Sequence, residues 1–127
     1  MGPTVLMIHS LFRWVVVIVG FVAFIRLLVG LVQKSLFTRL DRRLTMLFTI
    51  CMDIQVLLGI IAIILLGFNQ VRIEHAVTMI LALAAAHVPA RWRAAPDRVR
   101  FLYTLVSFTV SLILIVIGVS IVNGWVK

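Results

Sequence analysis

Four long apolar runs, separated by short polar segments, dominate the sequence. The runs cover approximately residues 11–32, 45–68, 73–90 and 101–122. A helix needs about 20 predominantly apolar residues to cross the hydrocarbon layer of a bilayer. Hydrophobic residues make up 64% of the 127 residues, and the mean hydropathy is +1.24, well above what a small soluble domain shows. The runs therefore predict an integral membrane protein with a single transmembrane domain, residues 1–127.

The short connections predict how the runs are arranged. Helices joined by short loops pack as antiparallel neighbours, so we expect an all-α, up-down-up-down four-helix bundle. Three runs carry stripes of small or polar residues at helical spacing. These are Gln55, Gly59 and Ala62; His75, Met79, Ala82 and Ala86; and Thr104, Ser107, Ser111 and Gly118. Such stripes allow helices to pack closely in lipid, and they could also leave room for a flat cofactor.

The charges predict the orientation in the membrane. The chain has 12 basic and 4 acidic residues, a net charge of +8. Most of the basic residues lie in or beside the first and third connections: Lys34, Arg39, Arg42, Arg43, Arg91, Arg93, Arg98 and Arg100. Clusters beside apolar runs are typical of cytoplasmic loops and of contact with anionic lipid, not of nucleic-acid binding. We therefore expect both termini to be extracytoplasmic, with Trp14 and Trp125 at the outer interface and Trp92 at the inner one.

Two charged residues, Arg26 and Asp53, lie inside the first two runs. Charged groups in hydrocarbon need a partner or a function. If the first connection is centred near Arg39, the two residues lie at equal depth on neighbouring helices. The sequence thus predicts an Arg26–Asp53 ion pair that clamps the helices together.

A second polar group is predicted at the outer face, where His9 and Arg13 would lie level with Glu74 and His75. Neutral imidazole is a good axial ligand for haem iron, so two histidines on different helices at one depth are candidate ligands. They could instead be interfacial histidines that bond water or headgroups. Glu74 is a candidate partner for Arg13. A zinc site at His9, Glu74 and His75 is disfavoured, because adjacent helical residues diverge by about 100°.

The third histidine, His87, is expected near the cytoplasmic end, level with Tyr103. It lies 12 residues after His75, or about 18 Å along one helix, so the two cannot share one iron. At most one haem is therefore expected, unless Met52 or a partner chain supplies a ligand. The single cysteine, Cys51, excludes an internal disulfide and is expected to be a small buried hydrophobe.

Three segments resemble a family of small bacterial four-span membrane proteins known as cytochrome b or cytochrome b-like. His9-Ser10-Leu11-Phe12-Arg13-Trp14 resembles the opening His-Ser-x-x-Arg-aromatic of that family. The segment from Asp53 to Gly59 resembles its second-helix Gln-x-x-x-Gly pattern, and Glu74-His75 with Met79 resembles its third-helix Glu-His-x-x-x-Met start.

The resemblance implies a haem-binding, electron-transfer protein of the bacterial inner membrane. It implies His9 and His75 as haem ligands, and it implies that Arg13, Gln55 and Glu74 bond the haem propionates or orient the ligands. Gly59 would leave space for the ring. We therefore expect one haem b in a protein of the lipid bilayer, with the quinone pool or a redox protein as electron partner. A homo- or hetero-oligomer is compatible with this expectation. The alternative hypothesis is a cofactor-free accessory subunit of a larger membrane complex.

Overall fold

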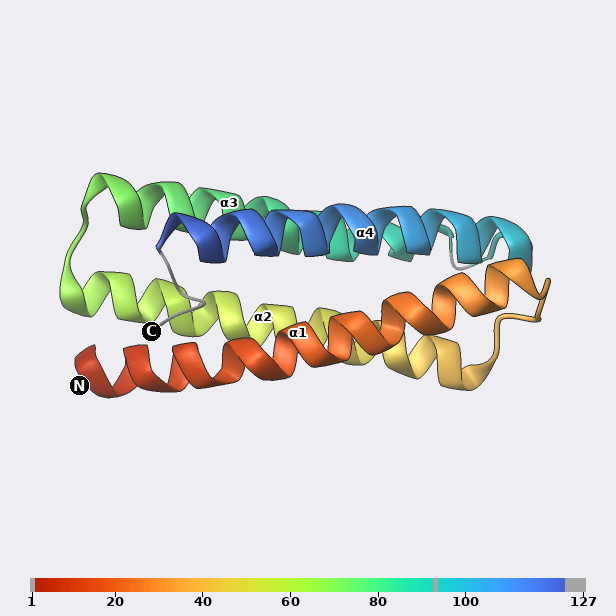
Figure 1. Ribbon diagram of the computed structural model, residues 1–127, viewed down its shortest axis with the longest axis horizontal. Coiled ribbons are helices and arrows are strands. Elements are labelled where there is room, and N and C mark those ends of the chain that lie inside the picture. Colours follow the sequence, from red (N-terminus) through yellow and green to blue (C-terminus); the bar gives the residue numbers. More distant parts are fainter. Residues whose placement is uncertain (1, 93, 123–127) are drawn as a thin grey trace.

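The computed structural model describes residues 2–92 and 94–122 and shows four long helices in this part of the chain (Figure 1). They are α1 (Gly2–Val32), α2 (Arg39–Leu66), α3 (Gln70–His87) and α4 (Asp97–Ile121), and a short 3₁₀ helix, Val88–Trp92, follows α3. The predicted all-helical fold is confirmed, and each of the four helical segments is long and apolar enough to cross a membrane. Arg93 of the second basic segment and Trp125 lie outside the described residues.

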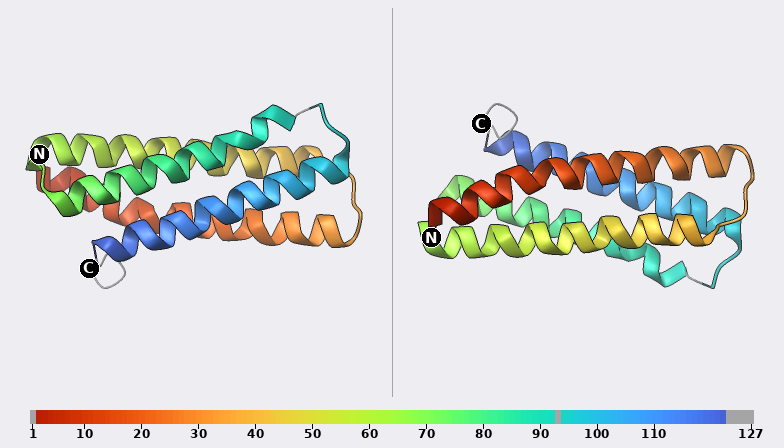
Figure 2. Two further views of the ribbon diagram at one scale, coloured as in Figure 1. Left: turned by 90° about the horizontal axis from the view of Figure 1, so that it is seen from above. Right: turned by 90° about the horizontal axis from the view of Figure 1, so that it is seen from below.

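Successive helices run in opposite directions along the long axis of the molecule (Figure 1). Helix α1 packs against α2 and α4, and α3 packs against the same two helices (Figure 2). One end of the bundle, here called the α2–α3 end, holds the start of α1, the turn at 67–69 and the end of α4. The opposite end, here called the basic end, holds the 33–38 loop and the start of α4.

Local sequence signals explain where α2 and α3 begin. The Thr38 hydroxyl accepts a hydrogen bond from the Asp41 backbone N–H at 3.3 Å, and the Asp41 carboxylate accepts one from the Thr38 N–H at 2.9 Å, which completes a capping box. At the other end, α2 stops at Gly67, whose φ of +96° favours glycine. The Asn69 side chain then accepts a bond from the Arg72 N–H and caps α3.

The helices extend beyond the apolar runs from which they were predicted. Helix α1 starts at Gly2 rather than at residue 11, and α2 starts at Arg39 rather than at residue 45. Polar residues such as His9 do not end a helix, and Pro3 is tolerated in a first turn, where its missing N–H is not needed. Hydrophobicity therefore marked the candidate membrane segments, whereas capping residues set where α2 and α3 begin.

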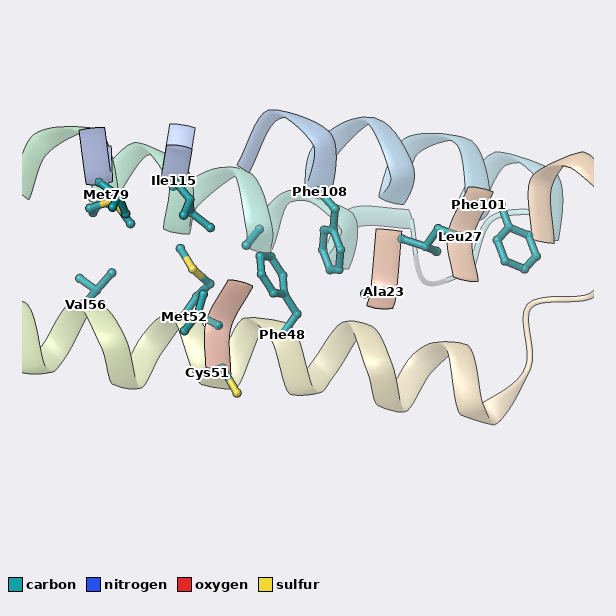
Figure 3. Close-up of a cluster of buried hydrophobic side chains, with 14 residues drawn as sticks. Ala23, Leu27, Phe48, Cys51, Met52, Val56, Met79, Phe101, Phe108 and Ile115 are labelled. Carbon is teal, nitrogen blue, oxygen red and sulfur yellow. The ribbon is translucent and has the colours of Figure 1, made fainter. Parts of the chain in front are cut away.

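The interior is packed with aromatic and aliphatic side chains from all four helices (Figure 3). The rings of Phe48 and Phe108 lie 4.6 Å apart between α2 and α4, and both are fully buried. Cys51 is buried, as predicted. Much of the predicted small-residue stripe on α4 also faces inward: Thr104, Ser111 and Gly118 are buried.

The outer surface of the bundle is largely apolar. Leu11, Ile18, Phe21, Leu57 and Ile64 each have more than half of their surface exposed. Side chains of this kind spread over every helix would be poorly solvated by water, but they match the acyl chains of a bilayer. The distribution supports a multi-pass membrane protein.

Candidate functional site

A cavity of about 850 Å³ lies between the helices at the α2–α3 end. Residues from all four helices line it, and most of the lining is aliphatic. Its polar lining includes His9 and Arg13 from α1, Gln55 from α2 and His75 from α3. Small-molecule sites commonly occupy 300–1,000 Å³ and combine apolar walls with a few polar groups. With Gly59, which also lines the cavity, the structure brings together five of the six predicted cofactor-site residues.

His9 is held to α2 by two reciprocal hydrogen bonds with Gln55. The His9 Nδ1–H donates to the Gln55 backbone carbonyl at 3.1 Å, and the Gln55 side-chain Nε2 donates to the His9 backbone carbonyl at 2.8 Å. A carbonyl can only accept, so the bond fixes the proton on Nδ1. Gly59 leaves room for the ring, because a Cβ there would lie 3.0 Å from His9 Cε1. The contacts with Gln55 and Gly59 therefore fix the position of the His9 imidazole between α1 and α2.

His75 is fixed in the same manner by α4. Its Nδ1–H donates to the backbone carbonyl of Gly118 at 2.6 Å. A histidine that binds a metal through one ring nitrogen usually donates the other N–H to a carbonyl or carboxylate, which sets its tautomer and orientation. In the described part of the chain, Nε2 of neither His9 nor His75 has a hydrogen-bond partner.

The two imidazole rings lie close together across the bundle. Their centroids are 6.3 Å apart, and the ring planes are nearly perpendicular at 88°. Two imidazoles that share one metal ion, with a metal–nitrogen bond of about 2 Å on each side, would have their ring centroids roughly 6 Å apart. The separation is therefore compatible with two ligands of one iron.

Two buried polar atoms of the cavity residues lack a partner among the described residues. They are Arg13 Nε and Gln55 Oε1. The Arg13 guanidinium also lies 5.1 Å from the centre of the Trp14 ring, an attractive cation–π distance. Buried polar atoms are normally paired, so an orphaned guanidinium N–H beside a cavity indicates a place for an anionic or hydrogen-bonding ligand group.

Glu74 does not join this cluster. Its side chain is exposed and accepts a hydrogen bond from Gln70 Nε2 at 3.2 Å. The predicted Arg13–Glu74 pair is therefore wrong, because Glu74 lies on the outward face of α3 while its neighbour His75 faces the bundle. No group of three or more His, Cys, Asp or Glu side chains that could hold a metal ion occurs among residues 2–92 and 94–122.

The predicted Arg26–Asp53 ion pair is also wrong. Arg26 Nε instead donates to Asp41 Oδ1 at 2.6 Å, and one of its terminal nitrogens lies 3.3 Å from Asp41 Oδ2. Asp41 is completely buried and also accepts the bond from Thr38 that caps α2. The Thr-x-x-Asp spacing of the capping box was the sequence signal that could have identified Asp41 as structural.

The register of the first hairpin explains the error. Gly20 lies against Phe48, and Gly59 lies against His9. In this register, residues at equal depth on α1 and α2 are equally far from residue 34, not from Arg39. Arg26 is therefore level with Arg42, next to Asp41, and Asp53 is level with Val15.

Asp53 has a different partner that was not predicted from the sequence. His87 Nε2 lies 2.8 Å from Asp53 Oδ1, and both side chains are 50% exposed. They lie on the outer surface that α2 and α3 form side by side, here called the α2–α3 flank. The expected alignment of His87 with Tyr103 is wrong, because Trp92 stacks on Tyr103 at a centroid distance of 4.7 Å, five residues further along the chain. No sequence signal joined Asp53 to His87, since the relative tilt of α2 and α3 decides which residues meet.

No protein-family model, curated protein or solved structure matches the chain.

Proposed function

We propose that this chain is a membrane electron-transfer protein that binds one haem b in the cavity at the α2–α3 end. The observation that carries the proposal is the pair of imidazoles, His9 and His75, 6.3 Å apart on one large apolar cavity and each oriented by a backbone carbonyl. Two neutral imidazoles on facing helices are the usual ligand set of a membrane haem b. When bound, haem supplies an iron that gains and loses one electron between its ferric and ferrous forms.

The other residues would each have a physical role in such a site. Nε2 of His9 and of His75 would ligate the iron, while the carbonyls of Gln55 and Gly118 hold the rings in place. The orphaned Nε of Arg13 would donate to a propionate carboxylate, a charge-assisted bond that is stronger than a neutral one. The apolar walls of the cavity would exclude water and would disfavour a large net charge on the bound group.

The proposal includes an orientation. The basic end would face the cytoplasm, as the positive-inside rule requires, and both termini would be extracytoplasmic. The haem would then lie near the outer face of the bacterial inner membrane. Its electron partner would be the quinone pool or a redox protein.

Absorbance spectroscopy on the purified protein tests this function. After expression with ample haem, the protein should show a Soret band and a reduced α-band, with about one haem per chain. His75→Ala should lose both bands because one axial ligand is gone, whereas His87→Ala should keep them because His87 does not line the cavity.

Two results would contradict the proposal. One is a colourless wild-type protein that is folded and helical, which would favour the cofactor-free accessory subunit. The other is a haem spectrum that survives both His9→Ala and His75→Ala unchanged, which would place the ligands elsewhere.

A further inference from the structure

The Asp53–His87 pair lies in an unusual place for two ionisable side chains. Asp53 is near the middle of α2, 14 residues after its first residue and 13 before its last. If α2 crosses the membrane, the pair lies within the hydrocarbon layer, yet half of each side chain is exposed on the outer flank. Ionisable groups at this depth normally face the inside of a bundle or a polar partner, since hydrocarbon solvates them poorly.

Each member of the pair also has one hydrogen-bonding atom to spare. The bond joins His87 Nε2 to Asp53 Oδ1. In the described part of the chain, His87 Nδ1 and Asp53 Oδ2 have no hydrogen-bond partner. A polar atom exposed to acyl chains costs free energy that a partner would recover.

The surrounding flank has the features of a helix-packing surface. Helix α3 contributes only three buried residues to the bundle, Met79, Ala82 and Ala86, against seven from α4. Ala84 is exposed one turn before His87, and Leu57 is exposed one turn after Asp53. A small residue beside polar groups lets a further helix approach closely in lipid.

We propose that a second copy of this chain covers the flank, in a dimer whose two-fold axis is parallel to the membrane normal. Such an axis brings identical residues together at equal depth, so the contact is isologous. His87 Nδ1 of one copy would then bond Asp53 Oδ2 of the other, and the reverse bond would form by symmetry. The proposal does not depend on haem binding.

The hydrogen-bond donors and acceptors of the Asp53–His87 pair favour a second copy of the same pair over a different partner. A net-neutral Asp53–His87 pair carries two exchangeable protons, one of which lies in the observed bond. The second proton resides on His87 Nδ1 or on Asp53 Oδ2, so in either form one of these two atoms is a donor and the other an acceptor. Two copies therefore satisfy each other completely, with no further charged group required.

Disulfide cross-linking of the full-length protein in liposomes tests the dimer. In a Cys51→Ala background, Leu57→Cys reports on the α2–α3 flank. Ile113→Cys is the matched control, since it is an exposed residue near the middle of α4, whose backbone neighbours are α1 and α3 and not α2. We expect a cross-linked dimer from Leu57→Cys and little from Ile113→Cys after mild oxidation. Equal cross-linking at the two positions, or none at Leu57→Cys, would overturn the proposal.

Removing the pair tests its role. Combined Asp53→Leu and His87→Leu substitutions should weaken dimerisation by about five- to thirtyfold, the range that hydrogen bonds between membrane helices provide. An unchanged dimer in this variant would overturn the proposal.

Because the variant could also misfold, photobleaching steps of the Cys51→Ala, Ile113→Cys protein labelled at residue 113 provide a second measurement with the pair intact. Two steps per particle at high lipid dilution support the dimer, and single steps overturn it.

Discussion

At the residue scale, several polar side chains in this bundle bond backbone carbonyls of a neighbouring helix rather than other side chains. Gln55 donates to His9, His75 to Gly118, and the buried Ser111 hydroxyl to Ala82 at 2.9 Å. A helical carbonyl keeps a second lone pair after its own helix bond is made. These bonds therefore join helices without placing an unpaired charge in the interior.

The Arg26–Asp41 ion pair, like the Asp53–His87 pair, joins two side chains on different helices, and its two members should be energetically coupled. Asp41→Asn should lower the free energy of unfolding in detergent by about 2–3 kcal/mol, because it leaves the guanidinium beside an uncharged, buried partner. Arg26→Gln should have a similar cost, and the double variant should cost at least about 1 kcal/mol less than the sum. Denaturation followed by circular dichroism measures all three variants.

Asp53 provides the control for this comparison of single and double variants. Asp53→Asn combined with Arg26→Gln should be additive within about 0.5 kcal/mol, because the two residues have no shared partner. Coupling of Arg26 to Asp53, with none to Asp41, would contradict the structure.

At the scale of the elements, glycines determine how closely α1 approaches its neighbours. Gly20 lies against Phe48 of α2 and Leu112 of α4, and Gly30 lies against the ring of Phe101 on α4. Phe101 is buried and packs on Phe37 at a centroid distance of 5.0 Å. The ring consequently has little freedom to move away from a larger residue at position 30.

Gly30→Ala should therefore destabilise the bundle even though alanine is the better helix former. The propensity gain is about 0.5–1 kcal/mol, whereas overpacking a rigid site costs about 1–3 kcal/mol. We expect a net loss of about 1 kcal/mol in thermal or denaturant unfolding. Val29→Ala, a neighbouring substitution on an exposed face, should change stability less; a Gly30→Ala protein as stable as the wild type would show that Phe101 can yield.

At the scale of the whole molecule, charge and cavity are at opposite ends of the bundle. Most of the basic residues lie at the basic end, where Arg100 is 3.9 Å from the centre of the Phe37 ring. The cavity with His9 and His75 opens at the α2–α3 end. The proposed haem would accordingly be remote from the headgroups that the basic residues contact.

Thiol labelling of intact cells tests the proposed orientation. In a Cys51→Ala background, Gln70→Cys at the α2–α3 end should react with a membrane-impermeant reagent. Ser35→Cys, in the loop at the basic end, should react only after the membrane is permeabilised, because basic loops stay in the cytoplasm. The reverse pattern would contradict the orientation.

The agreement between sequence and structure depends on the range of the interaction involved. Helix type and number followed from hydrophobic runs, which are local. The grouping of His9, Arg13 and His75 followed from approximate depth, whereas Gln55 was expected at the site only from the family resemblance. Depth has an error of about one turn, which a large cavity tolerates. An ion pair does not tolerate an error of this size, because its two side chains must lie within about 4 Å of each other. The partner of Arg26 was therefore predicted as Asp53 instead of Asp41.

The sequence by itself determined that the chain forms four helices suited to a bilayer, because about 20 apolar residues in a row have few other stable environments. It also contained the capping box that ends the first loop. Only the tertiary structure decided the partners: the register about residue 34 placed Arg26 beside Asp41, and the packing of α3 against α2 brought His87 to Asp53. These pairings depend on how side chains on different helices pack, and no periodicity within one helix encodes that.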